Sequence, residues 1–394
     1  MLCRGDLESF FQTKGSVKRN KIVYISIMLN SEKITAVFLL YNASKTVPAL
    51  VKAVYSQYYK GINNQSDWLD VIFIDDCSRD NTLSVLDQSL DQINNPSHYQ
   101  IIKNEKNLGL AATINKALES VKTPFVLTCH CDCFFGSEDY IAEMHRLLSE
   151  NPQIGALAGQ SYIPEGIEIS FAEKVNVITN LMDIFPADRD HELCPVGFAE
   201  GRCDGFNMEA LRKVAFYDTS LRTAGEDQVL AAKLRKNGYK VLQAVKLKYH
   251  LSVSDEQDSI RKLMRHQALF GRAHPFILLK NEGTHDGVSG EGAGTNRQLR
   301  MLLRVSQIFG VIAYLWVLLG LFWGISLSAS MLLIGIVFFF KIMIFMKHLK
   351  VMKLSMQEYY LFFSIQPLLD FSYVIGLIQG VYLLKNRTEN KPIA

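Results

Sequence analysis

The chain has 394 residues, of which 42 are lysine or arginine and 39 are aspartate or glutamate, so its net charge is only +3. So small a charge argues against nucleic acid as a partner, because nucleic-acid binding depends on a strongly positive surface. The length suffices for a large folded core and a further region. Seven scattered cysteines do not form the pattern of a disulfide framework, which favours a reducing compartment.

Residues 1–32 precede the first clear element and carry no structural signal. The stretch IVYISIML at 22–29 follows basic residues, as in a weak signal peptide, but no small-residue cleavage pattern comes after it. We therefore treat 1–32 as an N-terminal extension, in which either Met1 or Met28 is the start.

Strand-like and helix-like segments alternate from residue 34 to about residue 159. Apolar runs rich in β-formers occupy 34–41, 70–75, 99–104 and 124–129, and segments with helical spacing occupy 46–59, 81–92, 110–121 and 137–149. This alternation predicts an α/β fold with a mostly parallel, doubly wound sheet and helices on both faces.

Polar residues follow several of these strands at their carboxyl ends, where doubly wound sheets bind ligands. Tyr41 and Asn42 follow the first strand, Asp75 and Asp76 end the second, and 104–109 follows the third. No strand is followed by G-x-G-x-x-G, which argues against a dinucleotide-binding enzyme. The polar residues indicate a nucleotide site of another kind.

Three stretches resemble the opening of a family 2 glycosyltransferase with a GT-A fold, in both order and spacing. They are TAVFLLYNASKTVPALVKAVYSQ at 35–57, VIFIDDCSRDNT at 71–82 and NEKNLGLAATINKAL at 104–118. The resemblance covers about 33–280 and implies an inverting transferase that moves a sugar from a nucleotide donor to an acceptor hydroxyl. We assign the GT-A domain itself to 33–255.

The resemblance also suggests which residues bind the nucleotide. Tyr41 is placed to stack on the base, and Asp76 to accept a hydrogen bond from a uracil N–H, although a plain turn-forming role for Asp76 is the alternative. The family often has an arginine where this chain has Ile114, so one donor contact is missing. The residues assigned to nucleotide-sugar binding are Tyr41, Asn42, Asp75, Asp76, Asn107, Gly109, His130 and Arg272.

The stretch VLTCHCDCFFG at 126–136 carries an altered form of the family's D-x-D motif, His130-Cys131-Asp132. In the family the last carboxylate of this motif binds Mn²⁺ or Mg²⁺ on the diphosphate. A hard divalent ion that bridges phosphates needs only one or two oxygen ligands from protein, so Asp132 is the expected metal ligand. His130 is expected to bind the ribose, the sugar or a Mn²⁺ ion, which tolerates imidazole.

A zinc site built from Cys129, Cys131 and Cys133 is the alternative for this stretch, because alternate residues of a strand share a face. Structural zinc sites usually draw their ligands from spaced pairs, and no second pair with such spacing follows. We expect these thiols to be buried and inert.

The catalytic base is expected in TAGEDQVLAAKLRKNGYK at 223–240, which has helical apolar spacing. Its Glu226-Asp227 resembles the family's E-D motif, which implies Asp227 as the base that takes the acceptor proton and Glu226 as a residue on the acceptor side. The alternative is that both are simply acidic residues of a helix's first turn.

Residues 256–300 are predicted to form an interfacial helix and a glycine-rich linker. The helix, at 259–280, suits either the membrane surface or an ordinary amphipathic core position. Arg272 in it is a candidate for contacting the donor diphosphate or a lipid phosphate. The Q-x-x-R-W motif of processive synthases is absent, which argues against a cellulose- or hyaluronan-type polymerase. GVSGEGAG at 287–294 is the linker.

A transmembrane region is predicted at 301–385. The run 305–340 contains no charged residue and is too long for one span, so we expect two spans joined by a tight turn. The block 359–384, with Pro367 and Asp370 inside it, is either a third span or a re-entrant hairpin. Asp370 is either a polar contact within the bundle or a functional residue.

The lysines of KHLKVMK at 347–353 suggest that this segment is cytoplasmic, by the positive-inside rule. Two spans separate it from residues 1–300, so the catalytic domain is also expected to face the cytoplasm. The chain is thus expected to be a multi-pass protein of the plasma (inner) membrane with membrane lipids as partners. Residues 386–394 form a tail.

The sequence therefore predicts a membrane-anchored, metal-dependent transferase that moves a sugar, with UDP-sugar the expected donor, to a lipid-linked or cell-envelope glycan acceptor. GDP- and dTDP-sugars stay open as donors. One alternative is a polyprenyl-phosphate sugar synthase, although the usual D-A-D-L-Q-H-type stretch is absent. The other is an inactive GT-A scaffold protein, since the first D-x-D aspartate and the donor-loop arginine are missing.

Overall fold

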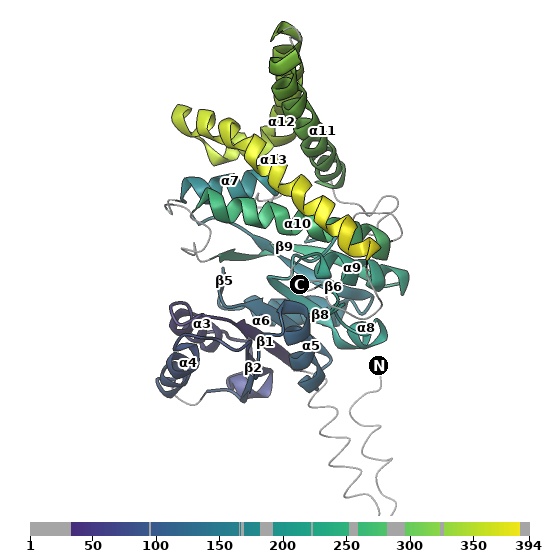
Figure 1. Ribbon diagram of the computed structural model, residues 1–394. Coiled ribbons are helices and arrows are strands. Elements are labelled where there is room, and N and C mark those ends of the chain that lie inside the picture. Colours follow the sequence, from purple (N-terminus) through teal and green to yellow (C-terminus); the bar gives the residue numbers. More distant parts are fainter. Residues whose placement is uncertain are drawn as a thin grey trace, which may run out of the picture.

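A computed structural model describes the ranges 33–93, 96–164, 166, 169–181, 192–221, 224–251, 259–281, 296–323 and 327–386. The N-terminal extension, the glycine-rich linker and nearly all of the tail lie outside these residues. A sheet-centred domain is followed by four long helices (Figure 1). The placement of the domain boundaries at 255 and 300 stays a prediction.

The described strands form one mixed sheet in the order β3-β2-β1-β4-β8-β6-β9-β5, with β7 paired to β9. The strands are β1 (Ile34–Leu40), β2 (Leu69–Asp75), β3 (Tyr99–Lys103), β4 (Phe125–His130), β5 (Cys133–Phe135), β6 (Ile154–Ser161), β7 (Leu193–Pro195), β8 (Cys203–Asn207) and β9 (Lys240–Leu251). The half made of β3, β2, β1 and β4 is parallel, as predicted. In the other half, β8 runs antiparallel between β4 and β6.

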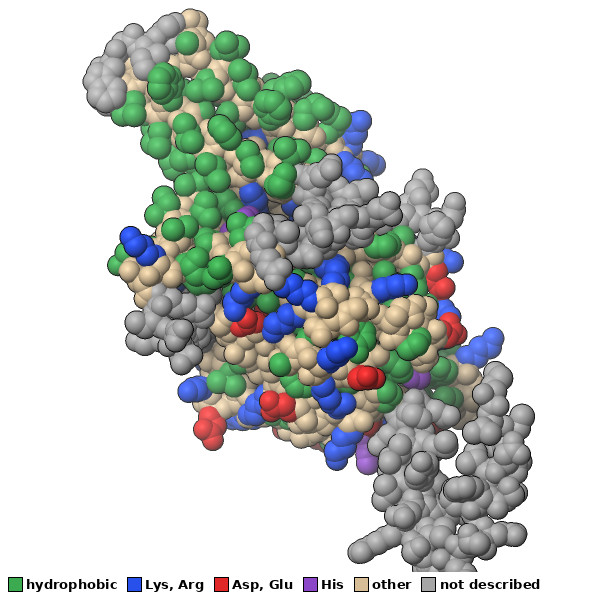
Figure 2. Space-filling model, turned by 90° about the vertical axis from the view of Figure 1, so that its right-hand side faces the viewer, with side chains coloured by type: hydrophobic (Ala, Val, Ile, Leu, Met, Phe, Trp, Pro, Cys, Tyr) green, Lys and Arg blue, Asp and Glu red, His purple; other side chains and the backbone are tan. Residues whose placement is uncertain are grey.

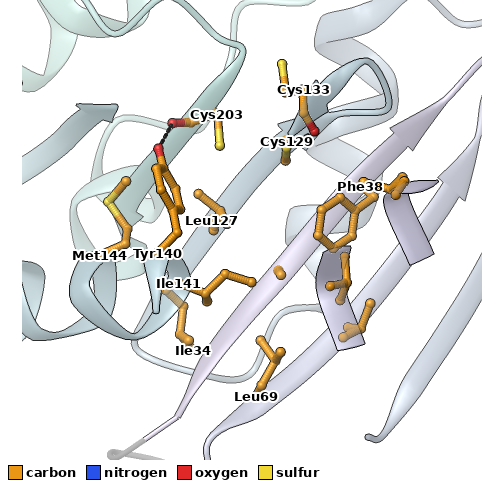
Figure 3. Packing of buried hydrophobic residues seen from close by; sticks show 14 of the residues in the cluster. Ile34, Phe38, Leu69, Leu127, Cys129, Cys133, Tyr140, Ile141, Met144 and Cys203 are labelled. Atoms are coloured by element: carbon orange, nitrogen blue, oxygen red, sulfur yellow. Dashed lines mark hydrogen bonds between the residues drawn. The ribbon is translucent and has the colours of Figure 1, made fainter. Parts of the chain in front are cut away.

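Helices cover both faces of the sheet, which confirms the α/β prediction. On one face lie α3 (Val47–Tyr55), α4 (Thr82–Asp91) and α6 (Tyr140–Glu150), and on the other α5 (Leu110–Ser120), α8 (Met208–Lys213) and α9 (Glu226–Lys236). The fully buried strand β1 serves both layers, because alternate side chains point to opposite faces. Phe38 packs in the first layer with Leu127 and Ile141 (Figure 3), and Val37 packs in the second.

Four long helices follow the sheet: α10 (Ile260–Lys280), α11 (Asn296–Trp323), α12 (Leu327–Met352) and α13 (Met356–Lys385). In the described part of the chain, α11, α12 and α13 are long and apolar enough to cross a membrane. Figure 2 shows apolar side chains gathered over this end of the molecule. Helix α13 is continuous through Pro367, so the re-entrant hairpin considered for this block is not formed.

Helix α13 lies along α10 at backbone contact distance (Figure 1). A Cβ atom at Gly376 would lie 2.0 Å from the carbonyl oxygen of Ala268, and one at Gly271 would lie 2.0 Å from that of Tyr373. Gly380 approaches Arg272 in the same way. Small residues four apart let helices pack this closely, so the glycines fix the apolar helices to the catalytic domain through α10. Together with α7 (Phe171–Thr179), these helices share one apolar cluster.

A buried ion pair joins the apolar helices to one another. Lys341 of α12 donates to a carboxylate oxygen of Asp370 on α13 at 2.7 Å, and neither side chain is exposed. Gln366 accepts from the same ammonium at 3.2 Å, and the Tyr314 hydroxyl of α11 donates to Asp370 at 3.4 Å. Of the two readings of Asp370, the structure shows the polar contact within the bundle.

We expect Gly376→Ala to destabilise the protein, because its methyl group has no room against the α10 backbone. The cost of overpacking is about 1–3 kcal/mol, which exceeds the gain of about 1 kcal/mol in helix propensity. Thermal unfolding in detergent measures the effect. Gly335→Ala is the matched control, since a Cβ there meets open space on α12, and it should not lower the melting temperature. Equal melting temperatures for the two variants would contradict the close-packing account.

Candidate active site

The carboxyl ends of β1, β2 and β4 open into a pocket of about 540 Å³. Parallel register brings them together, since Leu40 pairs with Asp75 and Leu39 with His130. The predicted site residues that line the pocket are Tyr41, Asn42, Asp76, Asn107, Gly109, His130 and Asp132. Those that do not line it are Asp75, Glu226, Asp227 and Arg272.

Asp76 holds together the loop that leads into α5. One carboxylate oxygen accepts from the Asn104 side chain at 3.0 Å and from the Leu108 N–H at 2.8 Å, and the other accepts from the Gly109 N–H at 3.0 Å. Gly109 has a φ of +83°, a conformation that favours glycine. A carboxylate has about four acceptor positions, so one position of Asp76 is left for a ligand donor such as a base N–H.

The Asn42 side chain ties the loop after β1 to the loop after β2, because it accepts from the Arg79 N–H at 2.9 Å. Asp75, fully buried, accepts from the Ser78 N–H at 3.1 Å within the second of these loops. Asn42 thus lines the pocket and Asp75 holds the loop beneath it, and a direct role of either in nucleotide binding stays a prediction. Tyr41 remains 46% exposed, which leaves its ring accessible to a base.

His130 and Asp132 lie at the end of β4 beside Arg202. The Nε2 atom of His130 is buried and has no hydrogen-bond partner within the described ranges. Burial lowers the pKa of His130, the negative charge of Asp132 opposes this shift, and the positive charge of Arg202 adds to it. The imidazole is therefore neutral at physiological pH, which is the form that ligates metal.

The residues present fit a divalent ion that is shared with a diphosphate. No group of three His, Cys, Asp or Glu side chains among the described residues is arranged to hold a metal ion alone. A phosphate-bridging Mg²⁺ or Mn²⁺ needs only one or two protein ligands, because phosphate oxygens and water complete its coordination. The Asp132 carboxylate and the unpartnered imidazole of His130 provide such ligands.

The cysteines around this motif belong to the core. Cys129 and Cys133 are fully buried, and Cys129 lies opposite Cys203 across the β4–β8 pair (Figure 3). Burial raises the pKa of Cys133 to about 11 and that of Cys131 to about 12, so the thiolate forms that bind zinc are disfavoured. The described residues thus support inert thiols over a zinc site.

Glu226 and Asp227 form the first turn of α9. Glu226 is 8% exposed, and its Oε2 atom has no hydrogen-bond partner among the described residues. Half-buried Asp227 accepts from the Gln228 N–H at 2.7 Å. Burial raises the pKa of Asp227 well above its ordinary value, and the negative charge of Glu226 raises it further. A carboxylate in this environment is a stronger base than one in water.

Comparison with known families decides the class of this site. Residues 35–215 match the family described as "Glycosyl transferase family 2". The chain carries a family 2 glycosyltransferase domain. The resemblance seen in the strand-end motifs is thereby confirmed, and the protein is a glycosyltransferase.

One solved structure agrees with this protein in fold. The mannosyltransferase PcManGT from Pyrobaculum calidifontis, in complex with GDP-Man and Mn²⁺, is 12% identical and aligns over 89% of this chain and 87% of its own, with a TM-score of 0.53. A fragment of S. aureus TarS is 14% identical over 91% of this chain and 93% of its own, but its TM-score of 0.46 supports no conclusion. At 12% identity, the first likeness confirms the fold alone. No curated protein sequence matches this chain.

Sequence reasoning missed three charged residues within AEGRCDG at 199–205 that interact electrostatically with predicted site residues or with one another. Glu200 and Asp132 both present negative charge to Arg202. Asp204, only 1% exposed on β8, has an Oδ2 atom without a hydrogen-bond partner in the described region. The sequence signal that could have identified them is the alternation of charged residues with glycine and cysteine in this stretch, directly before an apolar residue.

Arg272 is not brought to the donor pocket. Its backbone packs against Gly380 of α13, and its Nε atom is buried without a hydrogen-bond partner in the described residues. A role for Arg272 in binding a donor diphosphate stays a prediction.

Asp204 should make the stability of the glycosyltransferase depend on pH. Burial, with a smaller contribution from Glu200, raises its pKa to about 7, whereas an unfolded aspartate titrates near 4. The folded state therefore loses stability relative to the unfolded state as pH rises from about 4 to about 7, by up to roughly 4 kcal/mol. We expect Asp204→Asn to melt higher than wild type at pH 8, by a margin that shrinks at pH 5. Exposed Asp87→Asn is the control. A margin that does not change with pH would contradict the protonation of Asp204.

Proposed function

We propose that this enzyme is an inverting glycosyltransferase that moves a sugar from a nucleotide-sugar to a hydroxyl of a lipid-linked or cell-envelope glycan acceptor. The observation that carries the proposal is the pocket of the family 2 domain, where Asp76 and Asp132 converge. Asp227, a carboxylate of raised pKa, is the candidate base outside that pocket.

The pocket suits a nucleotide diphosphate. Tyr41 offers an exposed ring to the base, and Asp76 retains one acceptor position for a base N–H. The N-terminus of α5, which begins directly after Gly109, faces the pocket with the positive end of its dipole. UDP-sugar is the expected donor because of Asp76, with GDP- and dTDP-sugars open. The GDP-Man bound to PcManGT supports the donor class.

Asp132 is the residue that would hold a divalent metal, with His130 beside it. When bound, Mn²⁺ or Mg²⁺ supplies positive charge that stabilises the diphosphate as it leaves. The Mn²⁺ in the PcManGT complex supports metal dependence here. Asp132 orients the diphosphate end of the donor, and Tyr41 and Asp76 orient the base.

Asp227 is proposed to take the proton of the acceptor hydroxyl as that hydroxyl attacks the anomeric carbon from the face opposite the diphosphate. Its burial and the negative charge of Glu226 raise the pKa of Asp227, so its affinity for a proton is increased. Glu226 is itself buried, and it shapes the acceptor side.

The enzyme is proposed to be a multi-pass protein of the plasma (inner) membrane with its catalytic domain in the cytoplasm. Three long apolar helices support membrane association. Lys347, Lys350 and Lys353 near the α12–α13 turn favour a cytoplasmic position for that turn. The contact of α13 with α10 keeps the catalytic domain at the membrane surface.

We expect a matching nucleoside diphosphate to stabilise the purified enzyme when Mn²⁺ is present and not when EDTA replaces it. At about 100 times its dissociation constant, a ligand adds about 2.7 kcal/mol to the stability of the native state. Melting in detergent with UDP, GDP or dTDP, and with CMP and NAD as controls, measures this. Asp132→Ala should lose both the shift and the transfer activity. Asp227→Asn should keep the shift while transfer falls ~10²-fold or more.

Each outcome of this experiment distinguishes the proposed enzyme from one of its alternatives. Full transfer by Asp227→Asn would refute the base assignment. Absence of any metal-dependent shift with every nucleotide would favour the inactive scaffold protein, and His130 would then mark a lost metal site. A polyprenyl-phosphate sugar synthase, the second candidate, is favoured by the two arginines of α11 described below, and its acceptor would be the phosphate itself.

Activity should fall on the acid side, the acid limb of the pH–rate profile, at a pH above the pKa range of ordinary carboxylates. The reason is that Asp227 must be deprotonated to act as a base and its pKa is raised. Glu226→Gln removes the neighbouring negative charge, so the limb in kcat/KM should move to lower pH. Glu150→Gln, a change at an exposed site on α6, should leave the limb in place. A limb that stays fixed in Glu226→Gln would show that another group titrates.

A further inference from the structure

Two half-buried arginines of α11 lie where the apolar helices meet the catalytic domain. Arg300 and Arg304 are four residues apart and so lie on one face of the helix. The Arg304 guanidinium lies over the ring of Tyr373, 4.7 Å from its centroid, and 5.8 Å from that of Phe270. Arg300 lies over the ring of Phe198, which precedes β8, at 4.8 Å. Aromatic rings therefore hold both cations in place.

Neither arginine has a carboxylate in salt-bridge contact within the part of the chain that the structure describes. The Nε atoms of both are buried without a hydrogen-bond partner there. Arg304 donates to the Gln307 side chain at 3.0 Å, a neutral acceptor. Partial removal of a cation from water without a counter-charge is unfavourable, so the arrangement favours an anion that completes it.

The titratable groups that face this pair do not supply that anion. Burial lowers the pKa of His266 to about 4, and the charges of Arg202 and Arg304 add to the shift, so this side chain of α10 is neutral. Burial and the charge of Arg304 also lower the pKa of His274 to about 4. Asp227 is within electrostatic reach of Arg300, but it makes no salt bridge with it among the described residues. The pocket at the ends of β1, β2 and β4 is lined by neither arginine.

The position of the pair indicates which anion it binds. On one side Arg300 is near Asp227, the proposed catalytic base. On the other, α11 continues with the exposed apolar side chains of Met301, Leu302 and Val305. A phosphate at Arg300 and Arg304 would thus lie between the exposed apolar side chains of α11 and the first turn of α9.

We propose that Arg300 and Arg304 bind the phosphate or diphosphate group that joins the acceptor to its lipid chain. This proposal rests on the transferase function proposed above and names the substrate class as a lipid phosphate. Arginine suits the task because its planar fork of donors matches phosphate oxygens. The donor's diphosphate is the other source of the same chemistry, and the experiment separates the two.

Binding of farnesyl phosphate to the purified full chain in detergent tests the proposal, with farnesol and inorganic phosphate as comparison probes. Wild type should be stabilised in thermal melting by farnesyl phosphate and not by farnesol, with a weaker response to inorganic phosphate. Arg304→Gln and Arg300→Gln should each weaken farnesyl phosphate binding at least ~tenfold. Arg265→Gln is the matched control, because Arg265 is an exposed arginine of α10, and it should bind like wild type.

The shift in melting temperature with nucleoside diphosphate and Mn²⁺, measured on the same samples, tests the proposed transferase function separately from this proposal. An unchanged nucleotide response in both variants is the expected result. Loss of the nucleotide response in them, with farnesyl phosphate still bound, would assign the arginines to the donor and overturn the proposal. Equal binding of farnesol and farnesyl phosphate would also overturn it. If Arg304→Gln fails to fold, Arg304→Lys replaces it in the experiment, because lysine keeps the positive charge. Arg304→Lys should weaken farnesyl phosphate binding by a smaller factor.

Discussion

The close contact between α10 and α13 is the constraint on which the arrangement of this glycosyltransferase depends. On one side of α10, Gly376 and Gly380 admit no side chain between the two backbones. On the other, Ile277 occupies the place that a Cβ at Gly225 would take, 2.4 Å away, at the start of α9. The first turn of α9, which carries the proposed catalytic base, is thus positioned by the same helix that contacts the apolar region. A shift of the apolar helices would therefore be transmitted to the first turn of α9.

Removal of titratable groups from water, more than any single ion pair, explains the shifted pKa values in and near the site. Burial is the largest cause of the raised pKa of Asp227 and Asp204 and of the lowered pKa of His130. Each group is pushed toward its neutral form, so few fixed charges are held inside without a partner. The exceptions are arginines, which keep their charge under burial.

The parallel half of the sheet could be predicted because its signals are local. Apolar runs such as 34–41 and 70–75 end in polar residues, and the parallel register then brings Asp76 and His130 to one edge. The role of β8 was not predictable in this way, because its place between β4 and β6 depends on contacts far apart in the sequence. Arg202 was missed for that reason. The spacing of Gly376 and Gly380 was visible, but nothing local identified α10 as the partner.

The replacement of the first D-x-D aspartate by His130 need not remove the metal site. A carboxylate at this half-buried position would stand beside Asp132, so it would carry a desolvation cost and a like-charge repulsion unless Arg202 paired with it. A neutral imidazole avoids both and leaves Arg202 facing Asp132 and Glu200. Asp132 retains the carboxylate that a phosphate-bridging ion needs. The unpartnered Nε2 atom of His130 is a second candidate ligand, of a kind that Mn²⁺ accepts more readily than Mg²⁺ does. The substitution therefore leaves two side chains at this position that are able to ligate a metal ion.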